Sequence, residues 1–261
     1  MRPNELTLAT ERLILRQWKP SDREAFARIN ADPRVMEFLP AVLSRQESDK
    51  LCDRIEAHLE QHGFGLYPVE TRPNSLFIGF IGLSVPAFQA HFTPCIEIGW
   101  RLAFEHWGRG LATEGARAVM RYGFESLRLD EIVSFTVPAN VRSRRIMEKL
   151  RMTHAAADDF DHPGLPPGHP LGRARFVPIS ESDEVGNRLA ERLEQISFHT
   201  VRDLWQIFFG ILQEVRCGAV CFQRGFVFVL FVDKKAARLG AVAVYLVHHA
   251  TRFLPRLFGE S

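Results

Sequence analysis

Apolar and polar residues alternate or recur at regular spacings through the first two thirds of this 261-residue chain, and the spacings predict secondary structure. The alternation from Glu11 to Trp18 predicts a half-buried strand. Ser21 and Ser44 each stand three residues before a glutamate and an apolar face, so each predicts a capping box that opens an amphipathic helix. The second helix is expected to stop at Gly63, which suits a left-handed C-terminal cap.

Further strands and helices are predicted to alternate after Gly63. Strands are expected at Leu66–Glu70, Phe77–Val85, Cys95–Leu102, Ile132–Val137 and Arg173–Ile179, and helices at Gly108–Leu127 and Asn140–Leu150. Two antiparallel strands followed by a β-α-β-α order favour the α/β (α+β) class, with a mixed central sheet flanked by helices.

Composition excludes several classes of protein. Lys and Arg number 33 against 31 Asp and Glu, so the net charge of +2 supplies no field for nucleic acid. The segment Met1–Arg16 lacks the continuous apolar core of a signal peptide, so we expect a cytoplasmic protein. The four cysteines have spacings typical of neither a disulfide framework nor a metal site, and we expect reduced thiols.

The segment Trp107–Ala112 carries the clearest chemical signal, because it joins a predicted strand to a predicted helix. Gly108 and Gly110 allow the backbone to approach a ligand closely, and the first N–H groups of the helix would face it. Arg109 would add a charge-assisted bond. The pattern predicts a pyrophosphate site, and a tight strand-to-helix turn is the alternative interpretation.

This loop resembles the acetyl-CoA loop of GNAT acetyltransferases, with Trp107, Gly110 and Ala112 in the motif positions. The segments TERLILRQWKPSD, IEIGWRL, GRGLATEGARA and PANVRSRRIMEKL stand in the order and spacing of the RimJ/RimL-like branch, over about residues 8 to 179. The resemblance implies a GNAT fold with a V-shaped splay between two parallel strands, at 95–102 and 132–137. It also implies acetyl-CoA as co-substrate, no metal, and transfer to a primary amine, first of all a protein N-terminus, in a ternary complex.

The resemblance further implies which residues bind the co-substrate. The backbone of Ile98–Trp100 would pair with pantetheine and bind the thioester carbonyl, the loop would hold the pyrophosphate, and the start of the following helix would face the pantetheine arm and thiol. The implied cofactor-binding residues are Ile98, Gly99, Trp100, Trp107, Gly108, Arg109, Gly110, Leu111, Ala112, Thr113, Asn140 and Ser143.

Acetyl transfer requires a neutral amine and a stabilised leaving thiolate, which defines the catalytic candidates. Glu97 is our first candidate for the base, acting through water, and its alternative is a structural carboxylate paired with an arginine. Glu105 and His106 are weaker candidates. Many family members carry a tyrosine acid where this chain has Met147, so Ser143 is the nearest hydroxyl for the thiolate.

Two further features bear on this interpretation. Arg151 occupies a position where the family usually has glycine, and a residue held there at positive φ costs about 1 kcal/mol. Pro86–Pro94 is expected to be the acceptor-side loop, and it does not discriminate between acceptors. Acetylation of a small amine or antibiotic, and a non-catalytic acetyl-CoA-binding module, therefore stay open as alternatives.

The resemblance ends near Ile179, which divides the chain into a GNAT domain at residues 1–179 and an extension at 180–261. In the extension, Leu189–Val215 fits an amphipathic helix, and the apolar runs Phe226–Val232 and Ala241–Val247 are too short to span a bilayer. The extension would cover the GNAT core, form a homodimer face, lie on a membrane surface, or have no selected function.

Overall fold

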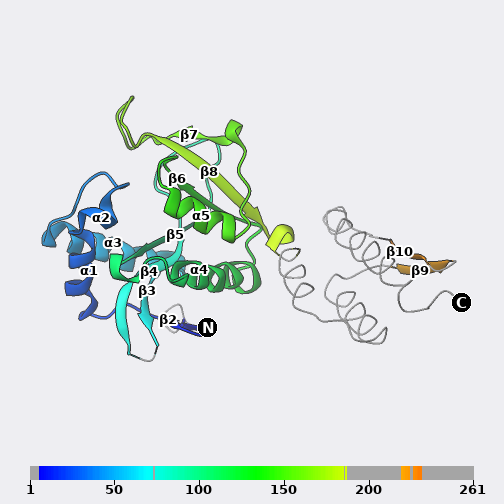
Figure 1. Cartoon of the computed structure of the whole chain (residues 1–261), viewed down its shortest axis with the longest axis horizontal. Coiled ribbons are helices and arrows are strands. Elements are labelled where there is room, and N and C mark those ends of the chain that lie inside the picture. The colour runs from blue at the N-terminus through cyan, green and yellow to red at the C-terminus, as the bar shows by residue number, and fades with distance from the viewer. Residues whose placement is uncertain (1–5, 73, 185, 187–218, 224–225, 231–261) are drawn as a thin grey trace, which may run out of the picture. The chain divides into compact units, whose positions relative to one another are not determined.

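A computed structural model describes residues 6–72, 74–184 and 186, together with the backbone of two strands within 219–230. The chain divides into two compact units, Met1–Ser180 and Glu181–Ser261, which we describe separately. The first unit contains, in chain order, β1 Leu8–Ala9, β2 Leu13–Leu15, α1 Asp22–Asn30, α2 Pro33–Met36, α3 Arg45–His62, β3 Leu66–Thr71, β4 Leu76–Ser84, β5 Glu97–Leu102, α4 Leu111–Arg121, β6 Glu131–Thr136, α5 Val141–Lys149, β7 Phe160–Asp161 and β8 Arg173–Ser180 (Figure 1).

The strands of this unit form one mixed sheet, in the order β1-β2-β3-β4-β5-β6-β8-β7. Neighbouring strands are antiparallel except β5 and β6, which run parallel. The chain reaches β6 from β5 through α4, as a parallel pair requires a crossover connection. The predicted mixed α/β sheet is confirmed.

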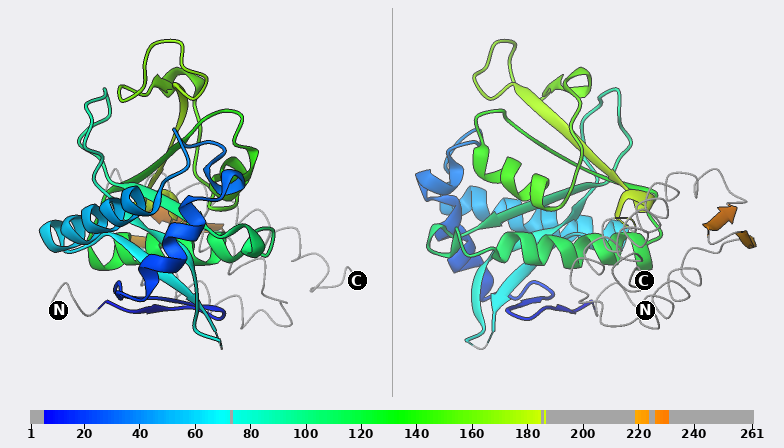
Figure 2. Two further views of the ribbon diagram at one scale, coloured as in Figure 1. Left: turned by 90° about the vertical axis from the view of Figure 1, so that its left-hand side faces the viewer. Right: turned by 45° about the vertical axis from the view of Figure 1, so that its right-hand side comes forward.

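Helices cover both faces of the sheet, and apolar side chains fill each interface (Figure 2). On one face, α4 and α5 pack on the larger core, which includes Ile81, Leu83, Ile98, Val119, Met120, Phe124, Met147 and Leu150. On the other face, Phe26 of α1 and Cys52 and Ile55 of α3 pack against Phe80 of β4. The helices on the two faces together bury the central strands that carry the candidate site.

A β-bulge in β4 changes which side chains face which layer. The register between β3 and β4 shifts at Val69/Glu70, so Ile78 is an extra residue on β4. Gly79 follows at φ 135°, and a Cβ there would lie 2.0 Å from the carbonyl oxygen of Arg101. Only glycine fits this backbone conformation and this close approach of β4 to β5.

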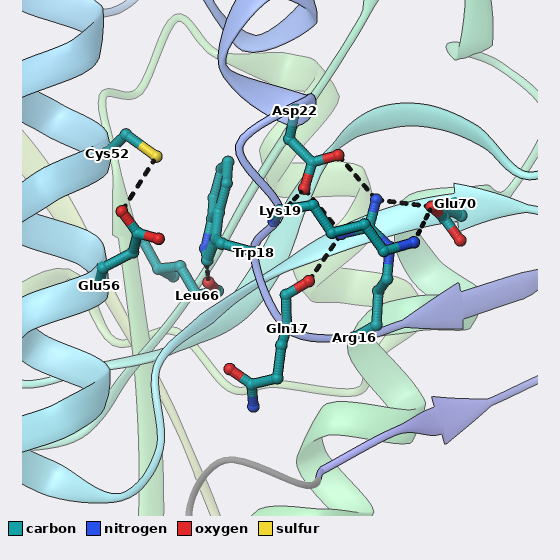
Figure 3. Close-up of polar contacts among 9 residues, drawn as sticks. All are labelled: Arg16, Gln17, Trp18, Lys19, Asp22, Cys52, Glu56, Leu66 and Glu70. Carbon is teal, nitrogen blue, oxygen red and sulfur yellow. Dashed lines mark hydrogen bonds and ion pairs between the residues drawn. The ribbon is translucent and has the colours of Figure 1, made fainter.

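A buried ionic network joins β2, α1 and β3 (Figure 3). The guanidinium of Arg16 contacts Asp22 at 2.7 Å and Glu70 at 2.6 Å, and the side chains of both carboxylates are at most 10% exposed. Lys19 also reaches Glu70, at 3.3 Å. Burial alone would lower the pKa of Arg16, but the hydrogen bonds and charges of the two carboxylates raise it above its ordinary value. The network fixes α1 against the sheet edge.

The predicted helix ends are confirmed in part. Ser44 and Glu47 form a complete capping box at α3, and Gly63 closes that helix at φ 76°. The capping box at Ser21 is wrong, because Ser21 has helical dihedral angles and its side chain makes no capping bond. Instead, the Asp22 carboxylate accepts a bond from the Lys19 N–H as well as the Arg16 pair. The start of α1 is therefore held by the buried ionic network and not by a Ser21 cap.

Other boundaries differ from the pattern by a few residues. The helix predicted at Gly108 begins at Leu111, and it continues past Arg121 as a π-helical turn, Tyr122–Ser126. The short elements α2 and β7 were not predicted, because four and two residues are too few to establish a period. Arg151 has φ 57°, which confirms the expected left-handed position.

The second unit is described only over strands β9, Ala219–Gln223, and β10, Phe226–Leu230, which pair antiparallel. The apolar run at Phe226–Val232 therefore contains a strand. The expected helix at Leu189–Val215 and the apolar run at Ala241–Val247 lie outside the described residues. Within the part of the chain that is described, no helix has both the length and the apolarity to cross a bilayer.

Candidate active site

A cavity of about 750 Å³ lies where β5 and β6 separate. Its walls come from β4, β5 and β6, the loop before α4, the first turn of α4, one side of α5, the segment that includes the end of α2, and the loop between β7 and β8. It brings together all of the predicted site residues except Arg109: Glu97, Ile98, Gly99, Trp100, Trp107, Gly108, Gly110, Leu111, Ala112, Thr113, Asn140 and Ser143.

The parallel strands β5 and β6 pair only at their start and then diverge (Figure 1). Glu97 is the β5 residue in register with β6, opposite Val133, and the Val133 N–H donates to the Ile96 carbonyl at 2.9 Å. One residue farther, the hydroxyl of Ser134 donates to the Ile98 carbonyl at 3.0 Å and bridges the opening gap. Beyond this bridge the strands leave room for a ligand between them.

The main chain of Trp100 faces this gap. The Ala103 N–H donates to Ile78 on β4, and residues of an antiparallel strand turn their main-chain groups alternately to its two sides. Ile98, Trp100 and Leu102 therefore turn theirs toward β6. The carbonyl of Ile98 accepts from Ser134, and that of Leu102 accepts from the Trp107 indole at 2.8 Å. Trp100 remains as the β5 residue whose N–H and C=O a ligand in the gap can pair with.

The loop before α4 has the geometry of an anion site. Gly110 is the N-cap of α4 at φ 76°, with no side-chain cap, and the first bond of the helix runs from the Glu114 N–H to the Gly110 carbonyl. The N–H groups of Leu111, Ala112 and Thr113 precede that bond and have no intrahelical partner. They line the cavity at the positive end of the helix dipole, which favours a phosphate.

An ionic latch holds this loop from outside the cavity. Glu114 accepts from the Arg12 N–H at 2.9 Å and from its guanidinium at 2.6 Å, and the same guanidinium donates to the Arg109 carbonyl at 2.9 Å. Arg109 contributes this carbonyl, and its exposed side chain does not line the cavity. The latch ties the β1–β2 turn to the loop and holds Gly110 in place.

The first turn of α5 supplies the opposite wall. The Asn140 side chain caps the helix by accepting from the Ser143 N–H at 3.1 Å. Met147 follows one turn later, buried in the core and in contact with the cavity. Of the tyrosines, Tyr67 and Tyr122 do not line the cavity, and Tyr245 lies outside the described residues.

Glu97 is the only carboxylate among the described residues that line the cavity. Burial raises the pKa of its carboxyl group to about 8, and a hydrogen bond from Ser84, its cross-strand partner, opposes the rise. Within the described residues no arginine forms an ion pair with Glu97, so nothing in this part of the chain supports the alternative of a structural ion pair. A carboxyl with a pKa near neutrality can exchange protons with an amine.

The weaker candidates are placed less favourably. Glu105 is exposed and lies 3.5 Å from Arg34 in an ion pair. His106 does line the cavity, and its buried Nδ1 has no hydrogen-bond partner among the described residues. Burial and the charge of Arg109 lower the pKa of its imidazole, while Glu105 opposes them. His106 stands on the loop side of the cavity.

The acceptor side differs from the prediction. The loop Pro86–Pro94 does not line the cavity, and its Phe88 and Phe92 pack instead with Phe135 and Phe160. The outer walls are made by residues 35–40, which follow from α2 into the next loop, and by residues 162–171 of the β7–β8 loop.

Three cavity residues were missed in the sequence. Ser134 is buried, and a serine inside an apolar strand is the signal that would have revealed it. Arg142 lies 4.6 Å over the Trp107 ring and pairs with Glu37, which joins α5 to the segment after α2. Arg101 lies on β5, where a charged residue within a buried strand was the available signal.

Within the described residues, no three His, Cys, Asp or Glu side chains gather as a metal site requires.

Comparison with known proteins is consistent with this geometry. A family model described as an acetyltransferase (GNAT) domain matches residues 12–153. The chain is 29% identical over 149 residues to YkkB of Bacillus subtilis, covering 57% of this chain and 86% of that protein. It is 30% identical over 181 residues to the FsC-acetyl coenzyme A-N(2)-transacetylase of Aspergillus fumigatus, covering 65% and 74%.

A solved structure shares the fold. The chain superposes on a GNAT-family acetyltransferase from Bacillus anthracis with a TM-score of 0.56 and 25% identity, over 67% of this chain and 99% of that one. The shared region corresponds in extent to the first unit, so the likeness concerns the mixed sheet and its helices.

Proposed function

The chain belongs to the GNAT acetyltransferase family and is an acetyltransferase, and on this premise we propose that it transfers the acetyl group of acetyl-CoA to a protein N-terminal α-amino group. The proposed route is direct attack of the amine in a ternary complex. One observation carries the proposal: a single cavity joins the bare N-terminus of α4, the gap between β5 and β6, and the carboxyl of Glu97.

The residues present fit acetyl-CoA, which enzymes of this family use. The N–H groups of Leu111–Thr113 would hold the pyrophosphate, and the main chain of Trp100 would pair with pantetheine in the gap. Arg142, Arg145 and Lys149 add positive charge to the same walls, as a ligand with several phosphates requires. Acetyl-CoA supplies an activated thioester carbonyl, and the protein needs only to bind, orient and deprotonate.

Glu97 is proposed to take the proton of the attacking amine, directly or through a water. Its pKa of about 8 matches that of an α-ammonium group, near ~8, so the proton transfer costs little. A lysine ammonium group has a pKa near ~10.4, and the same transfer would be uphill by about 2.4 units. This match supports an α-amino acceptor over a lysine side chain.

Ser143 is proposed to stabilise the departing thiolate. It is half-buried, lines the cavity in the first turn of α5, and its position at a helix N-terminus favours negative charge. A thiol of pKa ~8.5 leaves without a strong acid, so a hydroxyl donor suffices.

Turnover of acetyl-CoA with a panel of N-terminal peptides, lysine-containing peptides with blocked N-termini, and small amines tests the proposal. We expect release of CoA with the peptides that carry a free N-terminus. Turnover confined to small amines would replace the protein acceptor by a small molecule. Binding of acetyl-CoA without turnover on any amine would make the chain a binding module and refute the proposal.

Three finer proposals rest on the sequence. The four matching segments support the RimJ/RimL-like branch, the composition supports a cytoplasmic location, and the end of the resemblance near Ile179 supports a catalytic domain of residues 1–179. The role of residues 180–261, including a homodimer face, stays open among the alternatives named above.

A further inference from the structure

One face of β5 exposes a carboxyl, an open space and a guanidinium in a row. Glu97, Gly99 and Arg101 alternate along the strand and share this face, and all three line the cavity. A Cβ on Gly99 would meet no heavy atom within 4 Å, so the space between the two charged side chains is free. Alternate side chains of a strand point to opposite faces of the sheet, so these three residues share one face. The gap between β5 and β6 lies between the strands and not on this face.

Arg101 differs from the other described arginines that line this cavity. Arg142 pairs with Glu37 and Arg145 is exposed to solvent, whereas Arg101 is partly buried and pairs with no carboxylate of the described residues. Burial alone lowers its pKa, to about 10, and no neighbouring acid raises it. A partly buried cation without a counter-charge lacks the compensation that such groups normally have.

The guanidinium is nevertheless held in position. Its Nη1 donates to the Asn30 amide oxygen at 2.7 Å, and it lies 5.4 Å from the Phe80 ring. Asn30 is fully buried, and its amide nitrogen donates to Ser48 at 2.8 Å, which fixes the amide orientation. Arginine carries five N–H donors, so one bond to Asn30 leaves others for a ligand in the cavity.

We propose that Arg101 binds a carboxylate of the acceptor, and that the preferred acceptor is therefore a primary amine bearing an anionic group at a set distance. This inference rests on the proposed acetyl transfer and specifies its substrate class. The forked guanidinium matches a carboxylate in a two-bond arrangement. A polyamine would instead place an ammonium group beside Arg101 and be repelled.

The strand geometry sets the spacing between the two groups. Arg101 lies four positions after Glu97 on the same strand, which corresponds to about 13 Å. A hydrogen bond of about 3 Å at each end leaves about 7 Å between the amine nitrogen and the carboxylate. An N-terminal segment with an acidic second residue spans this distance, and so does a free ω-amino acid such as 6-aminohexanoate.

Matched substrates test the carboxylate site in the wild-type enzyme. The peptide Ala-Glu-Ala amide is compared with Ala-Gln-Ala amide, and 6-aminohexanoate with its amide, by kcat/KM and by binding to the CoA-saturated protein. We expect the acidic member of a pair to be favoured about tenfold or more, and the preference to shrink as salt rises. If the acidic peptide is preferred over the neutral peptide, the acceptor is a protein N-terminus. If a preference is seen only for 6-aminohexanoate over its amide, the acceptor is a small molecule.

Substitution of Arg101 identifies the residue responsible. Arg101→Gln should bring the acidic-to-neutral ratio of kcat/KM to about 1, chiefly through a loss with the acidic substrates, while the protein keeps its affinity for acetyl-CoA. Arg101→Lys should keep part of the preference. Arg28→Gln, at an exposed α1 arginine paired with Glu24, is the matched control and should change nothing. A loss of all activity in parallel would instead indicate a structural role through Asn30 and overturn the proposal.

The outcomes separate this inference from the proposed function. Equal binding and turnover of acidic and neutral substrates by the wild-type protein would refute the carboxylate site, even if Arg101→Gln failed to fold. Selective binding of the acidic substrates without CoA release would refute acetyl transfer and support the carboxylate site.

Discussion

Glu97→Gln should produce a defect that grows with pH. The substitution keeps the size and the hydrogen bonding of the side chain and removes its capacity to accept a proton. With a pKa of about 8, the wild-type carboxyl is ionised to about 3% at pH 6.5 and about 90% at pH 9. The ratio of wild-type to variant kcat/KM should therefore rise about thirtyfold over this range, toward the 10²-fold or more typical of a general base.

The ratio is the informative quantity, because the acceptor amine also titrates near ~8 and raises the rate of both proteins. Initial rates of CoA release are measured at low acceptor concentration from pH 6.5 to 9.5. Ser143→Ala serves as a comparison: it should lower the rate less, and by the same factor at every pH, since its hydroxyl does not titrate in this range. A ratio for Glu97→Gln that does not change with pH would remove Glu97 from the role of base.

The same pKa predicts an opposite effect on stability. Unfolding returns Glu97 to a pKa near 4.5, so between pH 4.5 and 8 the unfolded chain loses a proton that the folded chain keeps. The wild-type free energy of unfolding should therefore fall with rising pH, relative to Glu97→Gln. The side chain is partly exposed, so we expect the variant to gain roughly 1–2 kcal/mol at pH 7.5 over its difference at pH 4.5. Urea unfolding at the two pH values measures this, and a difference between variant and wild type that is the same at both would contradict the raised pKa.

Three further predictions concern the co-substrate loop, the buried network and the domain boundary. Gly110→Asp should weaken CoA binding in calorimetry about tenfold or more, while Gly110→Asn, which tolerates the same left-handed φ, should weaken it much less; equal affinities would refute the pyrophosphate site. Arg16→Met should lower the free energy of unfolding by about 3–5 kcal/mol, because Asp22 and Glu70 stay buried without their partner, and a loss below 1 kcal/mol in urea titration would contradict this. A chain ending at Ile179 should fold and bind acetyl-CoA, and failure to recover it folded, while the full-length protein is folded, would show that the tail is integral.

The sequence predicts most of the sheet and the co-substrate side of the site. Period-2 and period-3.6 patterns located the long elements, and local chemistry located the Ser44 cap, the Gly63 stop and the left-handed Arg151. These features depend on residues that are close in the chain. The loop at Gly110 belongs with them, because a strand end, a glycine and a helix start adjoin in sequence.

Features that depend on distant partners were not predictable. Ser21 does not cap α1 because Arg16 and Glu70 bring the Asp22 carboxylate into a buried network, which local propensity does not register. Pro86–Pro94 turned out to contribute core aromatics and not an acceptor wall. The raised pKa of Glu97 likewise comes from burial by surrounding elements. A carboxylate with an ordinary pKa would stay ionised throughout, so the sequence alone predicts that Glu97→Gln lowers turnover most at low pH, where the amine is protonated. Burial raises the pKa of Glu97, so the loss is instead expected to grow with pH.

No tyrosine lines the cavity among the described residues, so we expect a rate profile that rises with pH and does not fall. Met147, at the family's tyrosine position, is 2% exposed, so the sulfur side chain fills this wall with apolar surface. A tyrosine donor of pKa ~10 would deprotonate at high pH and produce a falling limb. The groups proposed to stabilise the thiolate are the Ser143 hydroxyl and helix N–H groups, which keep their protons up to pH 10. In the proposed reaction Glu97 and the acceptor amine are then the groups that titrate, and both raise the rate as pH rises. A falling limb below pH 9.5 in the wild type would show that a further acid takes part.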